Sequence, residues 1–268
     1  MSVVPLSYVD IGLAAVLLFM NAALSLALRL GLARRLLVAG ARMVVQLTLI
    51  GLVLKALFEL ASPTFTALAA LIMVLFAGRE AMARQERRFT GFWTYGIGTG
   101  SMMAAGIIVT VFGLATQISP DPWYDPRYAI PVLGMILGNT MNGVSLGLDR
   151  LVSGAVVQRA AIEAQLMLGA TATQAMRGVT RESMRAGLIP TINGMAAAGL
   201  VSLPGMMTGQ ILAGVEPVEA VKYQILIMFL IGGGTGLGLL AAVLLGARRL
   251  TDSRHRLRLD RLGAKADS

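Results

Sequence analysis

The sequence has 268 residues, of which 56% are hydrophobic and only 14% are charged, and its formal net charge at pH 7 is +9. Because about 25% of the residues of an ordinary soluble domain are charged, this composition excludes a soluble fold; at about 20 apolar residues per span, the chain has room for roughly six to eight membrane crossings and for no sizeable soluble domain. The absence of cysteine excludes a disulfide framework, a thiolate metal site and a cysteine nucleophile.

Seven apolar runs follow one another along the chain, each bounded by charged, polar or proline residues. They cover residues 8–28, 40–58, 64–78, 95–115, 128–148, 187–213 and 220–247. The third run is short, and we expect its helix to continue toward Arg84. No positively charged segment precedes the first run, so we expect a retained span and not a cleaved signal peptide. The sequence therefore predicts an all-α, multi-pass membrane protein with seven transmembrane helices in a single domain, 1–268.

Lysine and arginine are distributed unevenly among the connections. Cytoplasmic connections of membrane proteins carry most of the basic residues. Here 20 of the 23 lie in alternate connections and in the basic tail 248–268, and only Lys55, Arg127 and Lys222 lie on the other side. This distribution predicts the N-terminus outside and the C-terminus in the cytoplasm, and it explains the positive charge without a nucleic-acid partner. It also places the long connection 150–187 in the cytoplasm.

The fifth run combines closely spaced glycines with two amides. Pairs at small-x-x-x-small spacing, which allows helices to pack closely, are Gly134 with Gly138 and Gly143 with Gly147. Asn139 and Asn142 lie one helical turn apart near mid-bilayer, where a polar side chain is costly unless it faces protein or a water-filled path. Hydrogen bonding between helices and a substrate path are equal alternatives for these amides.

Residues 143–147, GVSLG, also match the nucleophile-elbow pattern of serine hydrolases, with Ser145 as the nucleophile. That pattern requires a strand-to-helix turn and a histidine base. The only histidine is His255, in the charged tail, so the sequence argues against a hydrolase.

The connection 150–187 has helical character. Arg159 and Glu163 are spaced i, i+4 on a pattern that ends at Gly169, a predicted helix stop, and Thr171 with Gln174 forms a capping-box pattern that begins a second helix. Along that second helix a basic stripe recurs every four residues: Arg177, Arg181 and Arg185. The stripe fits either a helix on the membrane surface that contacts lipid headgroups or a surface that meets a cytoplasmic partner.

The sixth run contains Pro204, flanked by polar residues that include Ser202 and Gln210. Proline removes a helix hydrogen bond, so we expect a kink or a break, which can mark a substrate site or a plain packing feature. The 16 methionines are interpreted as apolar filler, and no cluster of side chains defines a metal. None of the three lysines follows a glycine-rich loop, so ATP, if it drives this protein, binds to another chain.

Four strings carry a family resemblance: MILGNTMNGVSLGLDR, EAQLMLGAT, IPTINGMAAAGLVSLPGMMTGQILAG and AVKYQILIMFLI. The second, residues 163–171, resembles the EAA-x-x-x-G signature of ABC-transporter permeases, in which a short cytoplasmic helix binds a groove of the ATP-binding subunit. The proline that follows this signature closely in permeases stands further along here, at Pro190. Together the strings resemble the FetB-type iron-export ABC permeases of bacteria, which are similar to plant aluminium-sensitive transporter proteins.

The resemblance implies a permease subunit of the bacterial inner membrane that forms a homodimer and exports iron or another metal ion; for the plant relatives it implies handling of another metal or of a sugar nucleotide. A separate ABC ATP-binding subunit would bind ATP and Mg, whereas this chain would hold no cofactor and would not be an enzyme. The coupling residues implied are Glu163, Ala164 and Gly169, joined by the stripe of Arg177, Arg181 and Arg185. The candidates for a transport path are Asn139, Asn142, Ser202, Pro204 and Gln210.

A secondary transporter or channel without ATP coupling is the alternative, suggested by the glycine-rich and proline-interrupted runs. Proton-coupled carriers usually need carboxylates within the membrane, and here Asp10 and Asp149 lie at the ends of runs. The sequence therefore favours the ABC permease.

Overall fold

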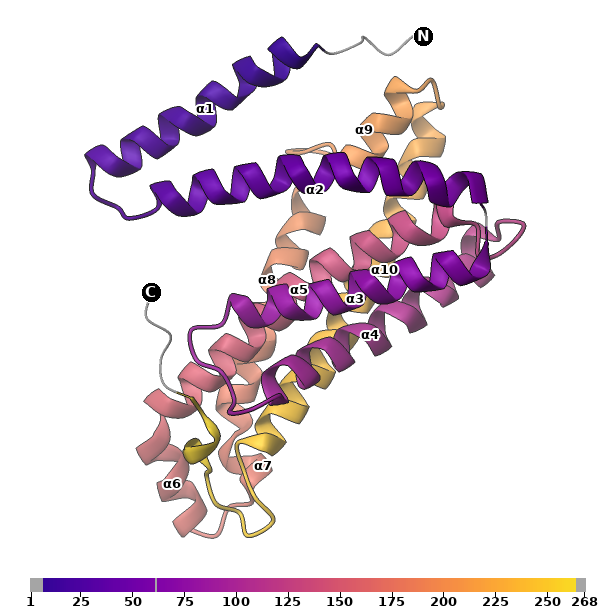
Figure 1. The fold of residues 1–268 in the computed structure, drawn as a ribbon. Coiled ribbons are helices and arrows are strands. Elements are labelled where there is room, and N and C mark those ends of the chain that lie inside the picture. Colours follow the sequence, from indigo (N-terminus) through magenta and orange to yellow (C-terminus); the bar gives the residue numbers. More distant parts are fainter. Residues whose placement is uncertain (1–6, 61, 264–268) are drawn as a thin grey trace.

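Figure 1 shows the computed structural model, which describes residues 7–60 and 62–263. Within these ranges the chain forms ten α-helices, a π-helical extension of α4 (Leu114–Ile118), a 3-10 turn (Leu259–Arg261) and a few isolated backbone bridges. The α-helices are α1 (Tyr8–Ala27), α2 (Ala33–Leu60), α3 (Pro63–Ala83), α4 (Trp93–Gly113), α5 (Pro126–Val157), α6 (Arg159–Met167), α7 (Ala172–Ala175), α8 (Arg177–Ala197), α9 (Gly205–Leu212) and α10 (Pro217–Arg249). The predicted all-α class is confirmed.

Six of the described helices are long and apolar enough to cross a membrane: α1, α2, α3, α4 with its extension, α5 and α10. The sequence predicts a seventh span over 187–213, but these residues are not one helix. α8 ends at Ala197 and α9 begins at Gly205, and between them Gly199 has φ +91°. Pro204, which has no N–H, stands at the N-cap of α9. The break predicted at this proline is confirmed.

Several helices extend beyond the apolar runs that predict them. α2 begins at Ala33, seven positions before its run, and α5 continues to Val157. α3 reaches Ala83 with Arg84 as its C-cap, so the predicted continuation toward Arg84 is confirmed. α8 already begins at Arg177 and passes through residue 187 without a boundary. Apolar side chains are needed only inside the bilayer, so a run underestimates a helix whose end lies outside it.

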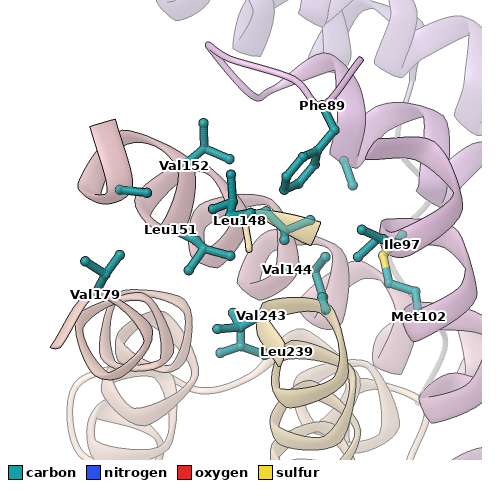
Figure 2. Packing of buried hydrophobic residues seen from close by; sticks show 14 of the residues in the cluster. Phe89, Ile97, Met102, Val144, Leu148, Leu151, Val152, Val179, Leu239 and Val243 are labelled. Atoms are coloured by element: carbon teal, nitrogen blue, oxygen red, sulfur yellow. The ribbon is translucent and has the colours of Figure 1, made fainter. Parts of the chain in front are cut away.

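The core of the bundle lies around α5, which packs against α3, α4, α8 and α10. Figure 2 shows its centre, where Val144, Leu148 and Leu151 of α5 are fully buried against Leu239 of α10 and Phe89 of the α3–α4 connection. Between membrane helices such a cluster is stabilised by van der Waals packing, because lipid tails are as apolar as the side chains themselves. This cluster therefore fixes the end of the bundle at which α6, α7 and the tail meet.

The hairpin of α1 and α2 lies apart from this bundle (Figure 1). Among the described residues, α2 buries only Ala33 and Leu57, and it makes few contacts with α5. From Leu60 and Pro63, which are close in sequence, α2 and α3 diverge. Most of the apolar surface of α2 is thus free to face lipid or another chain, and the space between the diverging helices, called the wedge, is lined by residues of α2, α3 and α5.

Candidate functional site

Two glycines bring the backbones of α5 and α8 together. A Cβ atom on Gly143 would lie 3.0 Å from the carbonyl oxygen of Gly187, and a Cβ atom on Gly187 would lie 2.7 Å from the carbonyl oxygen of Gly143. One turn further along α5, Gly147 faces Leu239 of α10. Any side chain at these positions would separate the helices, so α5, α8 and α10 meet at a fixed crossing.

The other two glycines proposed for packing lie in different surroundings. Gly134 faces Met73 of α3, whose terminal carbon would lie 3.2 Å from a Cβ atom at position 134. No described atom would lie within 4 Å of a Cβ atom on Gly138. Within one chain, therefore, close packing involves Gly143 and Gly147 much more than Gly138.

Ser145 is buried in the middle of α5, where the helix is continuous. Its Oγ donates to the carbonyl oxygen of Ala81 on α3 at 3.4 Å. His255 is in the tail, where its Nδ1 accepts a hydrogen bond from the backbone N–H of Ala172. The described residues thus form neither the strand-to-helix turn nor the Ser-His pair that a nucleophile elbow requires.

The end of the bundle that carries α6, α7 and the tail, opposite α9, is called the basic end below (Figure 1). α6 stops at Gly169, which has φ +92°, and the backbone N–H groups of Gly169 and Ala170 donate to the carbonyls of Leu166 and Gln165 at 3.0 Å. This pair of bonds is the Schellman motif. The Thr171 and Gln174 side chains form the reciprocal capping box of α7. The predicted helix stop and the predicted capping box are both confirmed.

α6 turns one side chain into the core and several outward. Ile162 is buried and anchors the helix, while Glu163 forms an ion pair with Arg159 at 2.9 Å on the surface. Ala164 is exposed, and at the tip of the α6–α7 turn Met167 and Leu168 are 83% and 87% exposed. Two large apolar side chains are therefore exposed next to each other at the tip of the α6–α7 turn, at the basic end.

The basic stripe belongs to α8, the same helix that crosses α5 at Gly187. Arg177 and Arg181 line a pocket of about 360 Å³ with Arg248 of α10, and Thr173 and Thr180 supply hydroxyl groups there. None of the described residues that line this pocket is acidic. The pocket thus concentrates three positive charges, while Arg185 lies exposed one turn further along α8.

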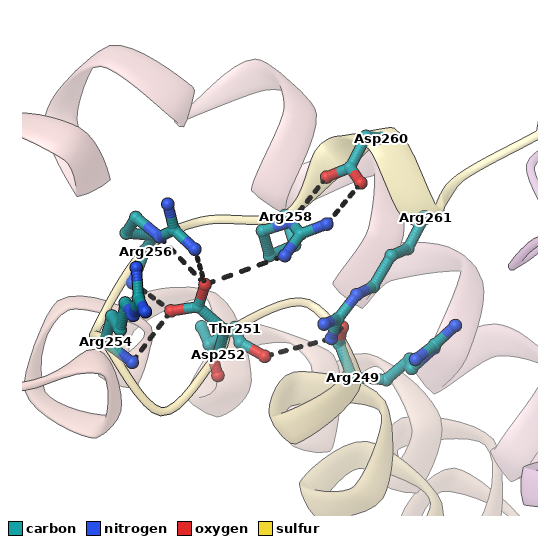
Figure 3. Close-up of polar contacts among 8 residues, drawn as sticks. All are labelled: Arg249, Thr251, Asp252, Arg254, Arg256, Arg258, Asp260 and Arg261. Atoms are coloured by element: carbon teal, nitrogen blue, oxygen red, sulfur yellow. Dashed lines mark hydrogen bonds and ion pairs between the residues drawn. The ribbon is translucent and has the colours of Figure 1, made fainter.

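The tail is folded against the basic end and not extended from it. Figure 3 shows its centre, where the Asp252 carboxylate accepts hydrogen bonds from the backbone N–H of Arg256 at 2.9 Å and of Arg254 at 3.0 Å. The Arg256 side chain adds an ion pair at 2.8 Å. These contacts, the Arg256 backbone bond first, lower the pKa of Asp252 to about 2. The pKa of Asp260 is likewise lowered to about 2, chiefly by the hydrogen bond from the Arg258 side chain.

Backbone hydrogen bonds join the tail to the α3–α4 connection. The N–H of Thr90 donates to the carbonyl of Arg261, and the N–H of Gly263 donates to the carbonyl of Arg88, each at 2.8 Å. Together with the bond between His255 and Ala172, these contacts hold the tail to two other connections at the basic end. The sequence predicts the charge of the tail but not this folding, because the partners are far away in the sequence.

The five candidates for a transport path lie in two separate places. Asn139 donates to the carbonyl of Met135 on its own helix at 2.8 Å, whereas Asn142 accepts from Arg84 Nη1 at 2.5 Å and so links α5 to the end of α3. Of the others, Ser202 is exposed in the break, Pro204 is the N-cap of α9, and Gln210 lies on α9, which packs against α10. The Oε1 of Gln210 is buried without a hydrogen-bond partner among the described residues.

The wedge between α2 and α3 holds a charged group that is not among the site residues predicted from the sequence. Arg42 and Arg84 both approach the Glu80 carboxylate, at 3.2 and 3.9 Å. The i, i+4 spacing of Glu80 and Arg84, and the position of Arg42 inside an apolar run, are signals that could have indicated it. The charge distribution assigns Arg42 and Arg84 to the connections between spans, so it gives no indication that they contact Glu80. Among the described residues, no three histidine, aspartate or glutamate side chains group as a metal site.

The fold defines a class: a multi-pass helical membrane protein in which six of the described helices are long and apolar enough to cross a membrane. A family model described as "Uncharacterised protein family (UPF0014)" matches residues 8–251, and the chain belongs to this family. No solved structure matches the chain.

Three relatives indicate what the family contains. The "UPF0014 membrane protein slr1647" of Synechocystis is 41% identical over 233 residues, 86% of this chain and 88% of the relative. The "Probable iron export permease protein FetB" of Escherichia coli is 35% identical over 237 residues, 88% and 89% of the two chains. The "Protein ALUMINUM SENSITIVE 3" of Arabidopsis thaliana is 32% identical over 223 residues, 83% and 80% of the two chains. The resemblance to FetB-type and plant aluminium-sensitive proteins is confirmed.

Proposed function

We propose that this chain is the permease subunit of an ABC transporter that exports iron or another metal ion from a bacterial cell. Two copies would form the membrane part in the inner membrane, and a separate ATP-binding subunit would bind ATP and Mg on the cytoplasmic side. The proposal takes the basic end as cytoplasmic, in agreement with the distribution of basic residues. The name of the E. coli relative, an iron export permease, supports the direction and the cargo.

The observation that carries the coupling role is the tip of the α6–α7 turn. Met167 and Leu168 are exposed there, while α6 is fixed to the core by Ile162 and its end is fixed by the Schellman motif at Gly169. A rigid, short helix with an apolar tip suits insertion into a groove of a partner. Glu163 and Ala164 on α6 would border that groove.

The pocket of Arg177, Arg181 and Arg248 also supports a partner-binding surface at the basic end. Its uncompensated positive charge would attract acidic side chains at the rim of a partner and would steer its approach. Because Arg181 and the crossing residue Gly187 lie on one helix, a displacement at this pocket would be transmitted along α8 to the contact with α5. That path would join ATP hydrolysis to movement of the membrane helices.

The test is the capture of an ATP-binding subunit and ATP-driven metal transport in inverted membrane vesicles. We expect Glu163→Arg, Met167→Asp, Leu168→Asp or Gly169→Asp to abolish both, with unchanged insertion and unchanged elution in size-exclusion chromatography. Glu163 is on an exposed ion pair worth at most about 1 kcal/mol, so its replacement should not unfold the protein. Met167→Leu, which keeps the apolar tip, is the matched control and should keep activity.

Two results would contradict the proposal. One is intact protein, isolated from native membranes under mild conditions, that never carries an ATP-binding subunit. The other is transport that continues without ATP and follows a pH gradient, which would indicate a secondary transporter.

A further inference from the structure

A crevice of about 450 Å³ lies in the wedge between α2, α3 and α5. Arg42, Gln46, Glu80 and Arg84 form its polar lining, and Phe76 and Met141 are among its apolar walls. Arg42 lies on α2, two residues inside the apolar run 40–58. A charged side chain at the end of such a run is costly unless it has a partner or water, and here its partner is a carboxylate that lines the crevice.

The carboxylate of Glu80 lies between two guanidinium groups. Its Oε2 is 3.2 Å from Arg42 Nη2, and its Oε1 is 3.9 Å from Arg84 Nη2. Arg84 also donates from Nη1 to the side-chain oxygen of Asn142 at 2.5 Å. All three charged side chains remain at least one-third exposed to the crevice and its mouth. Each guanidinium has five N–H donors, so most of its donors stay available.

The charge of this group selects the kind of ligand. Two arginines and one glutamate carry a net charge of +1, and the amides of Gln46 and Asn142 add no charge. A bare metal cation would be repelled by the two guanidiniums and would find one carboxylate, whereas metal sites need several oxygen, nitrogen or sulfur ligands. Arginine matches carboxylate and phosphate groups with paired N–H donors. The ligand that fits is an oxyanion.

We propose that this crevice binds the carboxylate or phosphate groups of the transported substrate, which crosses as an anion or as a metal chelate of net negative charge. This inference rests on the proposed transport function: a chelate would keep the metal as the cargo, whereas a free anion would replace it. In the absence of ligand, the Glu80 carboxylate pairs with Arg42 and Arg84. An oxyanion that enters the crevice replaces Glu80 as the partner of both guanidinium groups. The apolar walls at Phe76 and Met141 then bear the rest of the ligand.

Binding can be measured by isothermal titration calorimetry of the purified full-length protein in phosphatidylcholine nanodiscs, with four probes: citrate, ferric citrate, inorganic phosphate and ferrous ion alone. We expect at least one oxyanion probe to bind and ferrous ion alone not to bind. Arg42→Gln and Arg84→Gln should weaken oxyanion binding by about tenfold or more, since each removes hydrogen bonds to a charged group. Glu80→Gln should keep or strengthen it, because the competing carboxylate is gone.

Matched variants separate binding from folding. Arg34→Gln, at an exposed arginine near the start of the same helix, should leave binding unchanged. Arg42→Lys keeps the charge but loses the paired donors and should still weaken binding, so it serves where Arg42→Gln does not fold. Ferric citrate binding without citrate binding would assign the chelate, and binding of citrate or phosphate would assign the free anion.

Three results would overturn the inference. The first is binding of ferrous ion alone that Glu80→Gln abolishes and Arg84→Gln spares. The second is the absence of binding by every oxyanion probe. The third is loss of citrate binding when phosphatidylglycerol replaces part of the phosphatidylcholine, which would assign the crevice to a lipid headgroup. Capture of the ATP-binding subunit, measured on the same preparations, tests the proposed function separately and does not depend on these results.

Discussion

Gly143 of α5 and Gly187 of α8 face each other where the two helices cross, so close that each occupies the space that a side chain on the other would need. Leu239 of α10 closes the same crossing, because a Cβ atom on Gly187 would lie 2.6 Å from one of its methyl carbons. Because the two glycines have no side chains, the three helices can approach one another closely at this point. The helix that reaches this point from the basic end is α8, the one that carries the basic stripe.

Alanine at the crossing should destabilise the bundle. We expect Gly143→Ala and Gly187→Ala each to lower the free energy of unfolding by about 1–3 kcal/mol, since a methyl group would press against backbone that cannot move aside. Unfolding by sodium dodecyl sulfate in mixed micelles measures the change. Gly138→Ala, on the same helix with open space around it, is the control and should not lower stability. Equal effects at positions 138 and 143 would contradict this account of the crossing.

The capping box of α7 gives a local prediction. Thr171→Ala removes the side chain that accepts the backbone N–H of Gln174 at 3.3 Å, at a cost of about 1 kcal/mol. Hydrogen exchange followed by mass spectrometry should show faster exchange of the peptide that covers residues 168–176, with no change in α10. Thr173→Ala, on α7 but outside the box, should leave exchange in that peptide unchanged.

The Asp252 network in the tail gives a pH dependence. The pKa of Asp252 is about 2 in the folded tail against an ordinary value of 3.8, so its carboxylate stabilises the tail fully above about pH 4, and this stabilisation is lost as the pH falls toward 2. Hydrogen exchange of residues 251–263, corrected for its intrinsic pH dependence, should reveal loosening over this range. Asp252→Asn should loosen the tail already at pH 7 and should make its remaining stability less dependent on pH.

Ser145→Ala tests the nucleophile-elbow pattern. The hydroxyl group makes one long bond to Ala81, so its removal should cost less than about 1 kcal/mol of stability. ATP-driven transport by Ser145→Ala in vesicles should equal that of the unchanged protein. Loss of activity in a variant that elutes and unfolds normally would show that the hydroxyl group has a chemical role.

The sequence predicts well those features that depend on residues close together along the chain. Six of the seven apolar runs fall on helices that could cross a membrane, Gly169 gives the end of α6, and Pro204 gives the break before α9, since each depends on residues that are neighbours along the chain. Pro190 shows the limit of this reasoning, because α8 continues through it. Neighbouring helices can satisfy the backbone group that such a proline frees in a membrane helix.

The sequence does not predict contacts between residues that are far apart along the chain. Arg42 meets Glu80 from 38 positions away, and Thr90 meets Arg261 from 171 positions away. Charge counting treats each arginine as a marker of topology, so it assigns Arg42 and Arg84 to the flanks of connections. The two ion pairs of Glu80 in the folded chain show that both arginines lie beside the same carboxylate.

The folded tail also determines when the basic end can be completed during synthesis. Residues 251–263 leave the ribosome after every described membrane helix, yet they supply the carbonyl that Thr90 binds and the imidazole that caps Ala172. A nascent chain that has already inserted α10 therefore still presents α6 and α7 without these supports. The partner that we propose for this end would therefore meet the completed surface only after residues 251–263 have left the ribosome and folded against it.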